Sequence, residues 1–126
     1  LARRSKPAPA PAPTPAPSTS VTGCTGTAVA LTGEEARSLT LHNQQRATSG
    51  LAPFCVHPRL VDAARAHAQD MLARNYFSHT AAGGESFSAR VTRHGYTGWT
   101  ALAENIAWGS GTLGEPDAIF GSWMNS

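Results

Sequence analysis

Two short runs in the middle of the chain hold residue types that could do chemistry together. Residues 75–79 read NYFSH and residues 103–109 read AENIAWG, so each run sets one ionisable side chain, His79 or Glu104, among aromatic and small residues. A neutral imidazole and a carboxylate can both bind a divalent metal ion, and a carboxylate beside a histidine can orient the ring for acid/base work. We therefore interpret the two runs as two halves of one polar pocket.

The pair needs further groups before it could be a complete metal or catalytic centre. A stable zinc site takes three or four protein ligands, and His79 and Glu104 supply two. Ser78 and Ser126 are the available hydroxyl nucleophiles, but neither stands in a Gly-x-Ser-x-Gly turn. Three hypotheses stay open: a binding cavity, with or without a metal; a hydrolase that uses His79 and Glu104; and a structural pair that ties two segments together by hydrogen bonds. The residues favour binding over catalysis.

Length and charge limit the architecture and the partners. The 126 residues, 40% hydrophobic and 14% charged, suffice for one modest domain with a tail. Arg3, Arg4 and Lys6 supply three of the ten positive charges, whereas residues 21–126 hold seven arginines against eight acidic residues. A nucleic-acid-binding domain needs a clustered basic face, so we expect this nearly neutral domain to bind no nucleic acid.

The first 20 residues differ in composition from the rest. Residues 7–20 alternate proline with small residues, which favours an extended spacer, so we expect residues 1–20 to be a disordered linker and residues 21–126 to form the domain. The linker either holds the domain off an anchor or cell wall or has no specific role. No run of about 18 apolar residues occurs, so no membrane span is expected. Because the chain begins with Leu1, a signal peptide could have been removed before it.

Cys24 and Cys55 are the two cysteines, and two cysteines allow a single pairing. A disulfide between them would close a loop of about 30 residues and stabilise the fold by roughly 3 to 4 kcal/mol. The alternative is two reduced, half-buried thiols that fill the core. If the disulfide forms, the protein belongs in an oxidising compartment.

Apolar residues recur at helical spacing in several segments. The strongest pattern covers residues 58–74, with His67 on its apolar face. Thr32 and Glu35 can form a capping box for an earlier helix that ends near Gly50. The pattern also predicts a short helix over residues 86–94, a helix from Pro116 onward and a strand over residues 100–108.

For several other side chains, a structural role is preferred over a functional one. We expect His67 to be a hydrogen-bonded core residue, and Phe77 and Trp108 to pack in the core, because aromatic side chains build most small cores. Trp99 lies between glycine and threonine and is expected to be exposed. Glu85 could face the same cleft as His79, but an exposed loop carboxylate is the preferred interpretation.

Six motifs occur in an order that resembles the CAP superfamily, or SCP domain, of the cysteine-rich secretory protein, antigen 5 and pathogenesis-related 1 type. The bacterial secreted branch is the most similar, and the resemblance covers roughly residues 39–126. The motifs are LHNQQR at residues 41–46, PRL at 58–60, FSH at 77–79, GY at 95–96, AENIA at 103–107 and WMNS at 123–126.

The resemblance implies an α/β/α sandwich, secretion, and a surface cavity lined by two histidines and two acidic residues. His79 matches the first cavity histidine, Glu104 matches the acidic residue of the Glu-Asn motif, and Ser126 stands where relatives have the second acidic residue. The second histidine and the last strands of the fold would follow Ser126, so we expect the chain to hold the N-terminal two thirds of the domain. Ser78, Asn105 and Trp108 would support the cavity.

These observations predict an α+β, CAP-like domain that binds a small molecule, a lipid or a cell-envelope component outside the cell. A divalent metal, zinc first, would be held by His79 and Glu104 if one binds. A metal-assisted protease or other hydrolase is the first alternative, and a structural or adhesive surface domain is the second. The sequence leaves the oligomeric state and the identity of the ligand open.

Overall fold

The computed structural model describes residues 19–126, so residues 1–18 of the linker predicted for residues 1–20 lie outside the described residues. Within the described residues, four α-helices and one two-stranded sheet confirm the α+β class and the CAP-like fold. The elements in chain order are β1 (Thr19–Thr22), β2 (Ala28–Leu31), α1 (Gly33–Thr48), α2 (Pro58–Arg74), α3 (Phe87–Arg93), a 3-10 turn (Gly111–Gly114) and α4 (Pro116–Met124).

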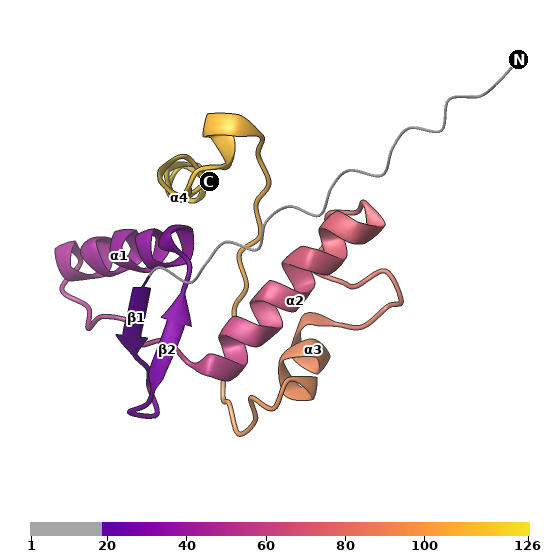
Figure 1. Ribbon diagram of the computed structural model, residues 1–126, viewed down its shortest axis with the longest axis horizontal. Coiled ribbons are helices and arrows are strands. Elements are labelled where there is room, and N and C mark those ends of the chain that lie inside the picture. The colour runs from indigo at the N-terminus through magenta and orange to yellow at the C-terminus, as the bar shows by residue number, and fades with distance from the viewer. Residues whose placement is uncertain (1–18) are drawn as a thin grey trace, which may run out of the picture.

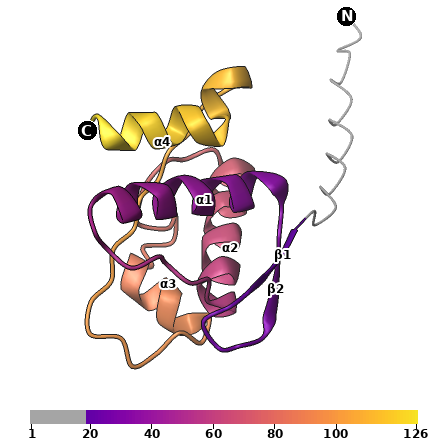
Figure 2. The ribbon, with the colours of Figure 1, turned by 90° about the vertical axis from the view of Figure 1, so that its left-hand side faces the viewer.

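The helices surround a small core (Figures 1 and 2). Helix α1 lies beside the β1–β2 hairpin, α3 packs along α2, and α4 lies against α1 on the side away from α3. The buried apolar side chains come from β2, α2 and α3, and the buried polar side chains come from the two helices. They are Val29, Leu31, Ala63 and Val91, with His67 and Arg90 as the polar members. No helix within residues 19–126 is long and apolar enough to cross a bilayer.

The two long helices begin where local chemistry favours it. At the start of α1, the Thr32 hydroxyl accepts from the Glu35 amide at 3.1 Å, and the Thr32 amide donates to Glu35 Oε1 at 2.8 Å. This reciprocal pair is the predicted capping box, and it satisfies two amides that helical bonding leaves free. Helix α2 has the predicted bounds, with a proline in its first turn and Asn75 in a left-handed conformation, φ 54°, at its end.

The β1–β2 hairpin was not predicted from the sequence. The strands pair antiparallel with Val21 opposite Val29, and Thr19 and Ser20, assigned to the linker, are the first two residues of β1. The signal that could have found it is the alternation in β2, where Val29 and Leu31 are buried and their neighbours are exposed. The hairpin thus covers one side of the core.

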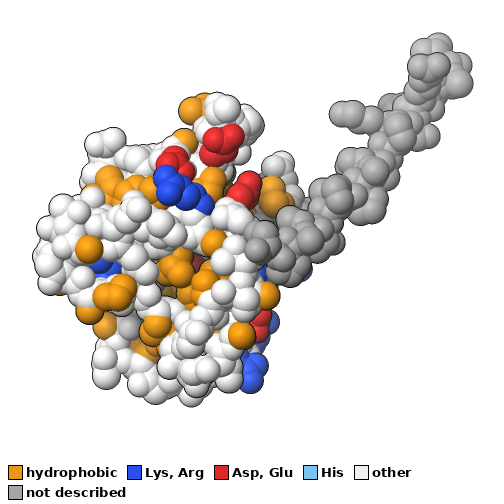
Figure 3. Space-filling model, turned by 60° about the vertical axis from the view of Figure 1, so that its left-hand side comes forward, with side chains coloured by type: hydrophobic (Ala, Val, Ile, Leu, Met, Phe, Trp, Pro, Cys, Tyr) orange, Lys and Arg blue, Asp and Glu red, His pale blue; other side chains and the backbone are white. Residues whose placement is uncertain are grey.

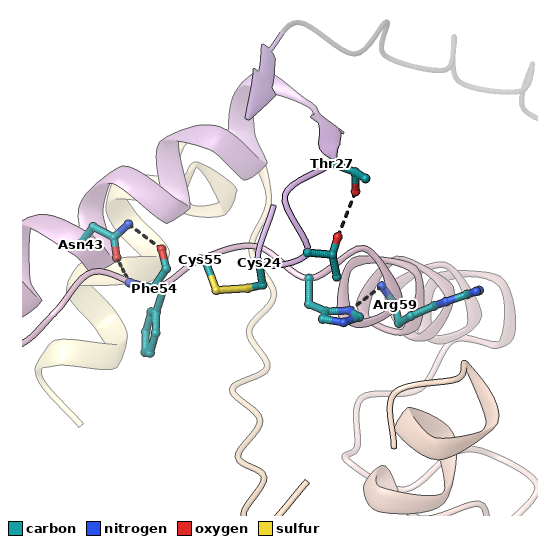
Figure 4. The surroundings of a disulfide bond; sticks show 8 residues. Cys24, Thr27, Asn43, Phe54, Cys55 and Arg59 are labelled. Carbon is teal, nitrogen blue, oxygen red and sulfur yellow. Dashed lines mark hydrogen bonds between the residues drawn. A yellow bond between two sulfur atoms is a disulfide. The ribbon is translucent and has the colours of Figure 1, made fainter. Parts of the chain in front are cut away.

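The predicted disulfide between Cys24 and Cys55 is present and joins the hairpin to the connection between α1 and α2 (Figure 4). The Cys24 amide donates to the Val56 carbonyl at 2.7 Å beside it. On the other side, the Asn43 side chain donates to the Phe54 carbonyl and accepts from the Phe54 amide, at 3.2 and 2.7 Å. Covalent and hydrogen bonds together therefore fix the α1–α2 connection at two points.

The prediction of a strand over residues 100–108 is wrong. Residues 101–109 have no regular secondary structure. A strand needs a neighbour to complete its hydrogen bonds, and β1 and β2 pair only with each other in the described part of the chain. Side chains anchor the segment instead: Glu104 hydrogen-bonds with His79 and Arg90, and the Trp123 indole donates to the Ile106 carbonyl at 3.3 Å.

The prediction that Phe77 and Trp108 pack in the core is also wrong. Phe77 is 49% exposed and Trp108 is 77% exposed, and both line an open groove of about 620 Å³ beside the C-terminal half of α2. With no strand at residues 100–108, no sheet face formed by residues 19–126 covers these rings. Hydrophobic side chains are visible on the surface in Figure 3, some of them inside a hollow. Trp99 is 38% exposed, as predicted.

Candidate functional site

His79 and Glu104 come together in the structure although 25 residues separate them. His79 Nδ1 lies 2.7 Å from Glu104 Oε1, a hydrogen-bond distance. His79 follows the end of α2 in the loop that leads to α3, and Glu104 lies in the irregular segment after α3. The Glu104 side chain is 16% exposed and the His79 side chain is 57% exposed. The pair therefore has a sheltered carboxylate and an imidazole that solvent can reach.

Arg90 on α3 contacts both members of the pair. Its Nη2 donates to Glu104 Oε2 at 2.7 Å, and Nη1 and Nη2 both donate to the His79 carbonyl at 3.2 Å. The Arg90 side chain is only 3% exposed. Sequence reasoning missed this residue. The available signal was its spacing, because Arg90 follows Phe87 by three positions in a short helix, which places a cation on the same face as an apolar residue.

The loop that carries His79 is held from α2. His67 is 4% exposed, and its Nε2 donates to the Ser78 carbonyl at 2.8 Å, so the prediction of a hydrogen-bonded core histidine is confirmed. The Tyr76 hydroxyl donates to Asp70 on the same helix at 2.6 Å, and this hydrogen bond raises the pKa of Tyr76. Two contacts from one helix thus fix the loop immediately before His79.

Two small cavities adjoin Glu104. One, of about 250 Å³, lies between α2 and α3, and the other, of about 230 Å³, lies between α2 and α4. Glu104 and Asn105 line both, which places the predicted support residue Asn105 beside the carboxylate. The His79 ring is not among the residues that line either cavity. The first is lined by Leu60, Ala63, Ala64, Phe87, Arg90, Val91, Ala103, Glu104 and Asn105, and the second by Ala64, His67, Ala68, Met71, Glu104, Asn105, Ile106, Ala107, Ile119 and Trp123.

The structure places three other candidate residues away from the His79–Glu104 contact. The Ser126 hydroxyl donates to the Trp123 carbonyl at the end of α4 at 2.6 Å, and Trp108 faces the open groove. Glu85 accepts two hydrogen bonds from Arg93, at 2.7 and 3.0 Å, and this contact holds the pKa of Glu85 below its ordinary value. Glu85 is therefore a loop carboxylate with its own partner, and it lines neither of the two cavities beside Glu104.

Comparison with known proteins places this arrangement in a family. The CAP family, described as "Cysteine-rich secretory protein family", matches residues 39–126, which include His79, Arg90 and Glu104. The chain belongs to the CAP family. The "Uncharacterized protein YkwD" of Bacillus subtilis (strain 168) is 34% identical over 102 residues, which cover 81% of this chain and 38% of that protein. The CAP chain thus spans well under half the length of this relative. No solved structure matches this chain.

The described residues bring no third metal ligand to His79 and Glu104, the pair at which a zinc ion was considered. Within residues 19–126, no three His, Cys, Asp or Glu side chains lie close enough together to hold a metal ion. The donor set points the same way, because one Glu104 oxygen bonds His79 and the other bonds the Arg90 guanidinium. His79 Nε2 is then the one ligand atom of the pair that makes no hydrogen bond to another described residue. A cation already balances the carboxylate, so these residues do not fit zinc.

Proposed function

We propose that this chain is an extracellular CAP module that binds a small molecule, a lipid or a cell-envelope component, with His79 and Glu104 as its polar centre. The observation that carries the proposal is the unequal exposure of the pair. Glu104 is sheltered and doubly bonded, whereas the His79 ring stands 57% exposed with Nε2 outside the pair. An exposed ring that is held by one nitrogen, and whose other nitrogen bonds no described residue, is suited to contact a ligand.

Binding fits the site better than hydrolysis does. The two hydroxyls considered as nucleophiles are engaged with the backbone: the Ser78 hydroxyl accepts from the Thr80 amide at 3.1 Å, and the Ser126 hydroxyl donates to the Trp123 carbonyl. An activated nucleophile would instead hydrogen-bond to its base, which here would be His79. We therefore propose a site without turnover chemistry of its own.

The experiment is thermal unfolding of the full chain with two probes, each added separately: phosphatidylglycerol vesicles and a peptidoglycan fragment. A ligand present at 100 times its Kd stabilises the folded state by about 2.7 kcal/mol, so binding should give a saturable rise in Tm. His79→Ala and Glu104→Gln should abolish the rise.

Glu85→Gln is the matched control, because Glu85 is a loop carboxylate with an arginine partner outside the Glu104 cavities. It should keep the wild-type response. A probe that stabilises all four proteins equally binds elsewhere and contradicts the proposal, as does a probe that the wild type cleaves.

The extracellular location is part of the proposal and is supported by the disulfide, since such bonds persist in oxidising compartments. Titration of free thiols in the unfolded protein, taken from its natural host without reductant, should find none. Two thiols per chain would place the protein in a reducing compartment.

A further inference from the structure

Among residues 19–126, Arg90 is the one side chain that bonds both to the Glu104 carboxylate and to the backbone of His79. We propose that Arg90 is a positioning residue, which holds Glu104 so that the neutral His79 ring carries its proton on Nδ1 and presents the lone pair of Nε2 to a hydroxyl or amino group of the ligand. This inference deepens the proposed function and rests on it.

The hydrogen bonds of Arg90 fix the position of the carboxylate relative to the ring. Arg90 Nη2 donates both to Glu104 Oε2, at 2.7 Å, and to the His79 carbonyl, at 3.2 Å. One guanidinium group therefore fixes the two residues relative to each other. With Oε2 held, the carboxylate can turn only its Oε1 toward His79 Nδ1, which lies 2.7 Å away. A guanidinium is planar and presents its donors in a fixed fork, which gives this control of orientation.

Burial makes the contact of Arg90 with Glu104 persistent. The two side chains are 3% and 16% exposed, so water competes little for their hydrogen bonds. The Phe87 ring lies 5.9 Å from the guanidinium carbon one helical turn earlier. The helix itself is fixed at its start, where the Ala89 amide donates to the Ser86 hydroxyl at 3.2 Å. Arg90 is therefore held on a rigid element, as a positioning residue must be.

The tautomer follows from the partner of Nδ1. An ionised carboxylate only accepts hydrogen bonds, so the nitrogen that faces Glu104 must carry a proton. In the neutral ring the other nitrogen, Nε2, is then an acceptor. A ligand that meets this nitrogen has to bring a donor, such as a hydroxyl or an amine. Removal of the Arg90 anchor would free the carboxylate to rotate and would leave the ring without a fixed tautomer.

The test is nitrogen NMR of the imidazole rings in the full chain labelled with ¹⁵N, at a pH where His79 is neutral. His79→Gln identifies the His79 signals. In the wild type, the two ring nitrogens should be well separated in chemical shift, with Nδ1 protonated. In Arg90→Met, the two signals should move toward each other as both tautomers become populated. Arg90→Lys, which keeps the charge and loses the fork, should show the same change to a smaller extent.

Arg93→Met is the matched control, because Arg93 lies on the same helix and pairs with Glu85 instead. It should leave the His79 signals where they are in the wild type. If Arg90→Met does not fold, Arg90→Lys decides, and an unchanged tautomer in either folded variant overturns the proposal. The wild type gives a further test without mutation: the Arg90 Nη protons should exchange with water more slowly than those of Arg93, and equal exchange overturns the proposed anchor.

These outcomes separate the inference from the proposed function, because the tautomer is measured without any ligand. If the tautomer depends on Arg90 but no probe raises Tm through His79, Arg90 positions the ring and the binding proposal fails. If a probe binds through His79 but the tautomer is the same without Arg90, binding stands and the positioning role is overturned.

Discussion

Glu35 and Glu104 are both carboxylates held by a buried or half-buried arginine, and they differ in how many of their oxygens the arginine bonds. Arg65 donates to both oxygens of Glu35, at 2.6 and 2.7 Å, and the Thr32 amide bonds one of them as well. Arg90 takes a single oxygen of Glu104 and leaves the other for His79. Both oxygens of Glu35 therefore bond to its arginine, whereas one oxygen of Glu104 bonds to the exposed ring of His79.

This difference distinguishes a structural contact, at Glu35, from a candidate functional site, at Glu104. The contact of Arg65 with Glu35 joins α2 to the start of α1, and a further hydrogen bond at 2.9 Å from Arg65 to the Ala30 carbonyl extends it to β2. Every strong acceptor there is used by the protein itself. At Glu104 the charge is balanced in the same way, but the carboxylate passes its second hydrogen bond to a side chain that faces solvent. An arginine contact thus becomes part of a candidate site when it occupies only half of the carboxylate.

The largest effect is expected from Arg90→Met. The change leaves a carboxylate with 16% exposure next to apolar groups without its cation, and breaking such a buried pair costs about 3 kcal/mol. Chemical unfolding of both proteins measures the difference. The exposed Arg93→Met should unfold like the wild type. A loss well below 1 kcal/mol in Arg90→Met would mean that the carboxylate is well solvated, and the contrast between sheltered carboxylate and exposed ring would disappear.

A middle-sized effect, about 1 kcal/mol, is expected from Glu35→Gln, because this ion pair is partly exposed and solvent screens it. It should also depend on pH. The hydrogen bond from Arg65 holds the pKa of Glu35 below its ordinary value, so the stabilisation is present above the unfolded-state pKa and is lost as the pH falls through the lower folded-state pKa.

The measurement for Glu35 is Tm from about pH 6 to about pH 3 for the wild type and the variant. The gap between the two curves should close toward the acid end. A gap that stays constant would show that the carboxylate charge does not contribute to the stabilisation.

The smallest effect on stability is expected from His79→Ala, about 0.5 kcal/mol, because the ring is 57% exposed and Glu104 keeps its Arg90 partner. Thermal unfolding without ligand measures it. A cost of about 1 to 3 kcal/mol would be that of a broken buried hydrogen bond, and it would favour the interpretation of His79 and Glu104 as a structural pair.

Local signals explain which parts of the fold were predictable. The bounds of α2 followed from apolar periodicity and Pro58, and the start of α1 followed from Thr32 and Glu35, because these signals act within one turn of helix. The hairpin and residues 100–108 depend on which strands find partners, which is a property of distant segments. The exposure of Phe77 and Trp108 has the same origin, since a ring is buried only if another element covers it.

The candidate site was predictable by residue type and less so by arrangement. His79 and Glu104 stood out as ionisable groups in aromatic runs, and the structure brings them within 2.7 Å. Arg90 did not stand out, because an arginine in a short helix is usually an exposed, solvated residue. Its burial depends on α3 packing along α2, which no spacing within residues 86–94 reveals. The ion pair of Arg90 with Glu104 could therefore be identified only from the three-dimensional structure.

The disulfide between Cys24 and Cys55 also determines how the chain would respond to mechanical force. The two cysteines are 31 residues apart, and the loop between them contains β2 and the whole of α1. A pulling force applied at Thr19 and Ser126 passes through the sulfur atoms and bypasses that loop. The fully stretched chain would therefore be shorter by roughly 110 Å, at about 3.5 Å per residue, until a reductant opens the bond and releases the hidden length.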